Sequence, residues 1–169
     1  MKHFAIDYGL VRTGLAVSDP DGVLAYPLAT LDLGRFPSRK AFLEELARRV
    51  REEAPGIVVV GLPLMDDGSE TLTTRQVRNF VQRLLHRVDV PVVLMPELLS
   101  SYEAECDLAE LGVTGKKRKA VLDQQAAVRI LESYLASPAT ARPVRGAAAP
   151  AAAGAHGATE DGAKGGETG

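Results

Sequence analysis

The N-terminal stretch KHFAIDYGLVRTGLAVS, residues 2–18, predicts two strands joined by a short turn. The first strand is Lys2–Tyr8 and the second is Gly14–Ser18, because both are apolar runs flanked by turn-forming residues. The sequence Asp19-Pro20-Asp21-Gly22 is typical of a turn, and a third strand is expected near Val23–Leu31. Three consecutive strands with tight turns predict an antiparallel meander.

After the third strand, helical and strand-like periods alternate along the chain. In chain order we expect a helix with the apolar stripe Phe42 to Val50, a strand at Ile57–Val60, a helix with the apolar stripe Val77 to Val88, and a strand at Val90–Met95. A helix opened by the capping-box pattern Ser100–Glu103 and a helix from about Lys119 to Leu135 follow. This order predicts an α/β fold with a mixed five-stranded sheet and helices on both faces.

Composition fits one globular domain, since 169 residues with 46% hydrophobic and 25% charged residues are ordinary for such a protein. The single cysteine, Cys106, excludes a disulfide framework or zinc cluster within the chain. No apolar run approaches the roughly 18 residues of a membrane span, so a cytoplasmic location is expected. The net charge of −2 argues against an indiscriminate polyanion binder, and any nucleic-acid site must be a local patch.

The composition changes sharply after Leu135. Residues 137–169 have no aromatic residue, have Val144 as their only large aliphatic one, and consist mainly of Ala, Gly, Pro and Thr. Such a segment cannot bury enough apolar surface to order itself, and its basic and acidic residues balance. We therefore expect a domain at residues 1–136 followed by a disordered Ala/Gly/Pro-rich tail.

Three carboxylates are candidates for chemistry. Asp7 lies inside the first strand and is followed by Gly9, whose missing side chain lets a phosphate or another backbone come close. Glu97 follows a buried strand, at the end where open α/β sheets place ligands. Asp123 lies on the apolar stripe of the last helix. Taken singly, each also fits a structural role: a turn cap, a surface residue, or a carboxylate satisfied by a lysine or the backbone.

Together, these carboxylates come from the first strand, a late strand and the last helix, all directed at one edge of the sheet. Mutually repelling carboxylates need a cation, and Mg²⁺ or Mn²⁺ prefers oxygen ligands. Two such ions about 3.5–4 Å apart activate water and stabilise a leaving oxygen. The pattern therefore predicts a metal-dependent phosphodiesterase with Asp7, Glu97 and Asp123 as metal ligands and catalytic residues.

Basic residues supply the candidate phosphate contacts. The run Lys116-Lys117-Arg118-Lys119 is expected immediately before the helix that carries Asp123, where positive charge is unfavourable with the helix dipole. Phosphate contact therefore explains it better than a solvated helix start does. Arg12 is a second candidate, because the first turn places it near Asp7. The loop Gly61–Ser69 could present backbone N–H groups to phosphate, which is a weaker indication.

Three ordered blocks extend this pattern over residues 3–135. They are Ile6-Asp7-Tyr8-Gly9 with Arg12, Gly14, Ala16, Ser18 and Asp19; Val60-Gly61-Leu62-Pro63 with Asp67-Gly68-Ser69-Glu70; and Lys116-Lys117 with Asp123, Ala126, Ala127 and Ile130-Leu131. In these blocks the chain resembles the YqgF/RuvX family of bacterial proteins. The resemblance implies an RNase H-like nuclease that acts on the 5′ end of pre-16S rRNA or resolves Holliday junctions.

The chain departs from this family before the third predicted helix. The family usually carries an Asp-Glu-Arg triplet followed by Leu and two hydroxyl residues, whereas this chain has Pro96-Glu97-Leu98 followed by Leu99-Ser100-Ser101. The resemblance keeps Glu97 as a ligand and Ser100 as a substrate-binding candidate. The arginine that would contact phosphate or support the glutamate is missing.

Two other function classes fit parts of the sequence. The Asp7-x-Gly9 pattern is similar to the phosphate loop of sugar kinases and actin-like ATPases, but those need two such lobes and this chain supplies one. A non-catalytic nucleic-acid or ribosome-assembly module has no use for clustered acids beside a polyanion. A nuclease remains the preferred interpretation.

The nature of the substrate follows from the resemblance rather than from the residues. Pre-rRNA, free or in ribosomal precursor particles, is the first choice, and branched DNA is the alternative. No residue indicates a contact to the 2′-OH. A junction resolvase makes paired cuts with two active sites, so a stable homodimer would favour DNA.

Overall fold

The computed structural model describes residues 1–99, 116–144 and 146–148, with the side chains of residues 116–120 excepted. The strands are β1 (His3–Asp7), β2 (Arg12–Ser18), β3 (Ala25–Asp32), β4 (Ile57–Leu64), β5 (Val92–Leu98) and β6 (Arg142–Pro143). The helices are α1 (Arg39–Glu53), α2 (Leu72–Leu85) and α4 (Lys116–Ala136), with short 3-10 helices η1 (Leu33–Arg35) and η2 (Pro138–Thr140). The helix expected to begin at Ser100 lies outside the described residues.

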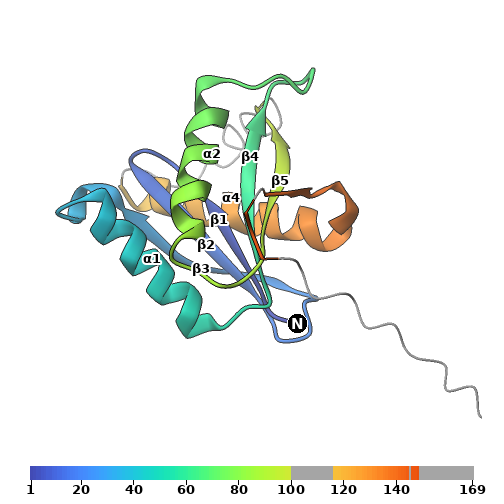
Figure 1. Cartoon of the computed structure of the whole chain (residues 1–169), viewed down its shortest axis with the longest axis horizontal. Helices are drawn as coiled ribbons and strands as arrows, with labels where there is room; N and C mark the ends of the chain where they lie inside the picture. The colour runs from blue at the N-terminus through green and yellow to red at the C-terminus, as the bar shows by residue number, and fades with distance from the viewer. Residues whose placement is uncertain (100–115, 145, 149–169) are drawn as a thin grey trace, which may run out of the picture.

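The sheet has the strand order β3-β2-β1-β4-β5-β6, with helices on both faces (Figure 1). β1, β2 and β3 form the expected antiparallel meander, while β1, β4 and β5 are parallel. The mixed α/β sheet predicted from the sequence is therefore confirmed. Because the three parallel strands point the same way, their carboxyl ends meet at one edge of the sheet, where open α/β sheets bind ligands.

The sheet has six strands where five were expected, because the chain continues in order beyond Ala136. Residues Pro138–Thr140 form η2, and β6 pairs antiparallel with β5 through Val93↔Pro143 and Leu94↔Arg142. Val144 packs against the core despite the polar, small-residue composition around it. The start of the expected tail at residue 137 thus carries secondary structure, and residues 149–169 lie outside the described part of the chain.

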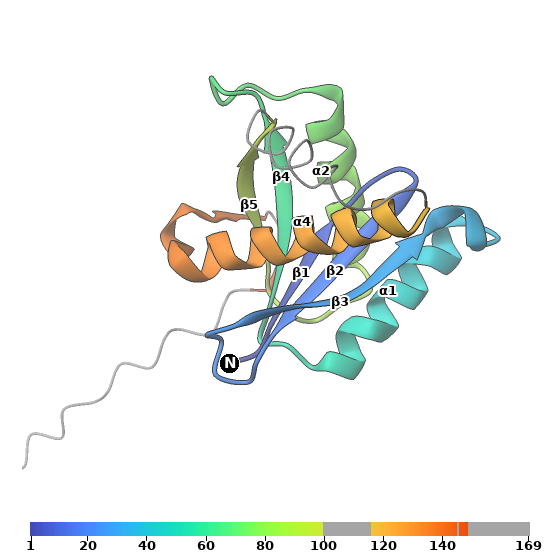
Figure 2. The same cartoon turned by 180° about the vertical axis from the view of Figure 1, so that it is seen from behind.

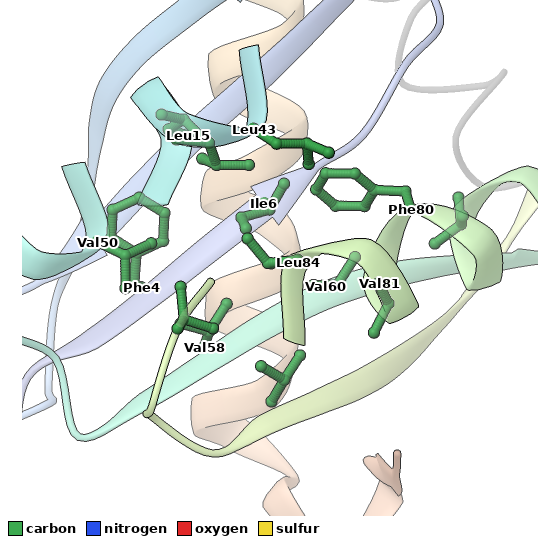
Figure 3. Packing of buried hydrophobic residues seen from close by; sticks show 14 of the residues in the cluster. Phe4, Ile6, Leu15, Leu43, Val50, Val58, Val60, Phe80, Val81 and Leu84 are labelled. Atoms are coloured by element: carbon green, nitrogen blue, oxygen red, sulfur yellow. The ribbon is translucent and has the colours of Figure 1, made fainter. Parts of the chain in front are cut away.

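The first core layer lies between the sheet and the helices α1 and α2 (Figure 3). Alternate residues of the strands face these helices, for example Phe4 and Ile6 of β1 and Val58 and Val60 of β4. The ring of Tyr8 stacks on Phe80 of α2 with a centroid separation of 4.1 Å. α2 begins at Leu72, where Thr71 and Thr74 form a reciprocal capping box.

α4 crosses the opposite face of the sheet (Figure 2). Small residues line the strands beneath it, and a Cβ atom added to Gly14 of β2 would lie 2.0 Å from the carbonyl oxygen of Asp123. A Cβ at Gly61 of β4 would lie 2.5 Å from Cδ1 of Ile130. The helix therefore approaches the sheet at backbone distance, and this contact fixes where Asp123 is placed. No helix in the described ranges is long and apolar enough to cross a membrane.

The boundaries of α4 differ from the expectation. The helix begins at Lys116 and not near Lys119, so the basic run forms its first turn and does not precede it. Lysine and arginine are good helix formers, and this propensity outweighs their unfavourable interaction with the helix dipole.

We predict that Gly14→Ala destabilises the protein by about 1–3 kcal/mol, because the added methyl group would meet the Asp123 backbone, which cannot rotate away as a side chain could. Urea unfolding of the variant and of wild type measures the difference. Gly34→Ala is the matched control, since its nearest neighbour is the side-chain oxygen of Asp32 at 3.2 Å. Equal destabilisation by the two substitutions would contradict the proposed close contact.

We also predict that a chain ending at Ala136 is less stable than the full chain by about 1 kcal/mol, because it loses the β5–β6 pairing and the apolar contacts of Val144. A chain ending at Ala148 should unfold at the same temperature as the full chain. Thermal unfolding followed by circular dichroism compares the three. A chain ending at Ala136 that matches the full chain would show that β6 contributes nothing to stability.

Candidate active site

Asp7 is placed by the alternation of β1. Ala5 packs in the layer under α4, whereas Phe4 and Ile6 face α1 and α2. Two residues after Ala5, Asp7 therefore lies on the α4 face, at the carboxyl end of the strand. Gly9 closes the turn that follows, because a Cβ there would lie 2.4 Å from the Arg12 carbonyl oxygen. The close approach expected at Gly9 is thus made by the protein's own backbone.

Glu97 reaches the same face from within β5, and not from beyond the strand as expected, because the pairing with β4 continues to Leu98. Val93 and Met95 belong to the layer under α4, and Glu97 continues that alternation near the end of the strand. It is in register with Pro63 of the parallel strand β4. The carboxyl ends of β1 and β5 therefore present one acidic side chain each on one face of the sheet, on either side of β4.

A cavity of about 200 Å³ connects these carboxylates to α4. It is lined by Asp7, Tyr8, Gly9, Arg12, Gly61, Pro63, Thr73, Glu97, Leu98, Leu99, Asp123, Ala126, Arg129 and Ile130. The structure therefore brings together the three predicted carboxylates and Arg12. The side chains of Lys116, Lys117, Arg118 and Lys119, and the whole of Ser100, lie outside what the structure describes.

The carboxylates influence one another electrostatically. The pKa of Asp7 is raised to about 7, first by burial and then by the negative charge of Asp123, with a smaller contribution from Glu97. The guanidinium of Arg129 opposes this increase. Burial also raises the pKa of Asp123, against the hydrogen bond and charge of Arg12. Ionisation of Asp7 and Asp123 is therefore unfavourable in the folded protein, and a bound cation would offset this cost.

Two arginines pair with two of the carboxylates. Arg12 donates a hydrogen bond from Nε to Oδ2 of Asp123 at 3.0 Å. Arg129 forms an ion pair in which Nε lies 4.0 Å from Oε2 of Glu97, and both side chains are less than a fifth exposed. Arg129 was not among the residues predicted from the sequence, because it stands outside any run of basic residues. A single arginine next to the buried Ile130, six residues after Asp123, was the available indication.

The chemistry of the donor set fits a hard divalent cation. Carboxylate oxygens are the ligands that Mg²⁺ prefers, and it usually binds one or two of them together with water and substrate phosphate oxygens. Within the described ranges, no group of three or more His, Cys, Asp or Glu side chains is close enough to hold an ion. An ion at this site would therefore take one or two carboxylates as the side chains stand, or the arginine pairs would open.

Comparison with known proteins decides the family. The family model described as "RuvX: Holliday junction resolvase" matches residues 1–137. The chain belongs to the RuvX family. A relative from Nitratidesulfovibrio vulgaris (strain DP4), named "Putative pre-16S rRNA nuclease", is 55% identical over 138 residues, which are 82% of this chain and 95% of the relative. A relative of the same name from Lawsonia intracellularis is 53% identical over 135 residues, 80% of this chain and 93% of that protein.

The fold of this RuvX family member is that of RuvC. The structure of T. thermophilus RuvC in complex with a Holliday junction substrate superimposes with a TM-score of 0.52 at 16% sequence identity, covering 85% of this chain and 99% of that one. The RNase H-like fold expected from the sequence is therefore confirmed.

We predict that, without metal, the free energy of unfolding falls as pH rises from about 4 to about 7. In this window the native Asp7 carboxyl, with a pKa of about 7, holds its proton while the unfolded one, near 3.8, has lost it. The native state binds more protons, so raising the pH favours unfolding. Asp7→Asn should keep only the part of this dependence that comes from the raised pKa of Asp123, and it should be more stable than wild type at pH 8 by on the order of 2–4 kcal/mol.

Urea titrations in EDTA across this pH range measure both proteins. Glu44→Gln, which changes an exposed carboxylate on α1, should follow the wild-type curve. Parallel curves for wild type and Asp7→Asn would show that Asp7 does not have a raised pKa.

Proposed function

We propose that this RuvX family member is a metal-dependent nuclease in which Asp7, Glu97 and Asp123 are the catalytic carboxylates. The observation that carries the proposal is the convergence of these residues: β1, β5 and α4 each contribute one to the wall of the same cavity. Carboxylates gathered at one point oppose each other and repel a polyanion unless a cation is added. A nuclease that binds divalent ions between its carboxylates and the phosphodiester would account for this arrangement.

Each carboxylate has a role in this proposal that follows from its position. Asp7 and Asp123 interact most strongly and would share one Mg²⁺ or Mn²⁺ ion, with Glu97 completing the ligand set from across β4. A bound divalent ion supplies Lewis-acid activation of water and of the phosphodiester. The burial of Asp7 keeps bulk water away from its carboxylate and strengthens its interaction with a cation.

Substrate binding in this proposal depends on cationic groups around the cavity. Arg12 lies on the cavity wall and would exchange its contact with Asp123 for a phosphate oxygen when a metal ion engages that carboxylate. The basic run at residues 116–119 forms the first turn of the helix that carries Asp123, which supports a role in holding the backbone of the nucleic acid. Ser100 is retained as a further contact by family resemblance.

The substrate we propose is the 5′ end of pre-16S rRNA, either free or in ribosomal precursor particles. The protein would cut it as an endonuclease, in the cytoplasm. The names of the relatives that are 53–55% identical over most of both chains support it. The alternative is a four-way DNA junction, which the description of the family model favours. A stable homodimer with two active sites would support this alternative.

We predict that Asp7→Asn abolishes cleavage while substrate binding is kept or tightened, because the change removes a metal ligand and a negative charge together. The assay compares a pre-16S 5′-leader RNA with a four-way DNA junction, in Mg²⁺ or Mn²⁺ and in EDTA. Glu44→Gln on the opposite helical layer is the control for loss of a carboxylate.

Each outcome of this assay selects one alternative. Metal-dependent cutting that Asp7→Asn loses supports the nuclease, and the polymer that is cut identifies its substrate. Unchanged turnover in Asp7→Asn removes this residue from the site. Binding of both polymers without cutting of either would overturn the catalytic proposal in favour of a binding module.

A further inference from the structure

We infer that Arg129, which α4 places in the wall of the cavity, is a second phosphate-binding arginine of this site beside Arg12. The inference rests on the proposed function, because it assigns a contact to the phosphodiester backbone of the same substrate. Nothing in the sequence pattern alone assigns a role to Arg129. Its position in the folded chain does.

The Arg129 side chain lies in the wall of the cavity that holds the carboxylates. It is part of this wall together with Asp7, Glu97 and Asp123, although it is six residues from Asp123 along α4. Side chains on a helix lean toward its N-terminus, which is the direction of Ala126 and Asp123 from Arg129. Both of these residues also line the cavity.

The guanidinium of Arg129 interacts with Glu97 and Asp7. Its Nε lies 4.0 Å from Oε2 of Glu97, and its charge lowers the pKa of Asp7, so it is near two of the three carboxylates. With the side chain only 19% exposed, this charge acts in a region that is screened less than the open surface. A phosphate bound between these carboxylates would lie within reach of the same guanidinium.

Leu98, at the end of β5, borders the same cavity as Arg129. It follows Glu97 directly in the strand. A guanidinium at residue 98 and one at residue 129 would therefore enter the same space from different elements. Arginine suits this role because its planar fork of donors matches two phosphate oxygens, which a lysine cannot reproduce.

Charge balance favours such a group. Three carboxylates and two arginines line the described part of the cavity, so acidic groups outnumber basic ones there. Arg12 already donates to Asp123. Among these described residues, loss of Arg129 would leave one guanidinium against three carboxylates and would weaken the approach of a polyanion.

The test is to move the arginine. Arg129→Leu, the double variant Leu98→Arg with Arg129→Leu, and Arg129→Lys are compared with wild type and with Arg51→Leu, which removes an exposed arginine from α1 on the other face. Binding of a fluorescein-labelled 5′-leader RNA, and in parallel a four-way DNA junction, is measured by anisotropy in EDTA at several salt concentrations. Cleavage is then measured with Mg²⁺ or Mn²⁺.

We expect Arg129→Leu to weaken binding about tenfold and to lower the slope of log affinity against log salt by about one. It should raise KM more than it lowers kcat. Arg129→Lys should keep the salt slope but lose part of the affinity. The double variant should recover most of the binding, and Arg51→Leu should match wild type.

Several results would overturn the inference. One is wild-type affinity and salt slope in a folded Arg129→Leu, as judged by circular dichroism and melting temperature. Another is a fall in kcat alone, which would mean that Arg129 only positions Glu97. Failure of the double variant to recover binding would show that position 98 does not reach the same phosphate. If wild type binds but cuts neither polymer, the nuclease proposal fails, while the EDTA binding data still decide the role of Arg129.

Discussion

The contact between α4 and β2 at Gly14 is the constraint on which the site depends. Backbone meets backbone there, with no room for a Cβ atom, and the residue contacted on the helix is Asp123 itself. Gly61 and the small residues Ala5 and Ala16 extend the same close approach along the sheet. The helix therefore cannot slide without a clash, and the distance from Asp123 to the strand carboxylates is set by packing.

The electrostatics of the site follow from this packing. Burial and the neighbouring carboxylates raise the pKa of Asp7. Arg12 of the β1–β2 hairpin and Arg129 of α4 pair with the other two carboxylates, Asp123 and Glu97. These cations offset part of the negative charge and lie on the wall that a phosphodiester would meet. The same residues therefore serve both stability and the proposed chemistry, and a change in one alters both.

Much of this arrangement was predictable from the sequence because alternation and helical periodicity are local. They placed Asp7 on the first strand and Asp123 on the last helix, as the structure has them, and parallel strands imply a shared edge. Glu97 was expected after its strand and lies inside it, because β5 continues to Leu98 in register with β4. Two features escaped prediction because they depend on tertiary contacts. A lone arginine at residue 129 is placed in the site through its ion pair with Glu97, and β6 forms because it pairs with the edge of β5.

The strand β6 also determines how the sheet ends. An uncovered β5 would present a row of unpaired N–H and C=O groups to any other chain, which is the usual route to edge-to-edge aggregation. β6 covers part of that row with only two residues, and one of them is Pro143, which has no N–H to donate. A strand this short, with a proline, is a poor template for further pairing. Association of copies through this side of the sheet is therefore disfavoured.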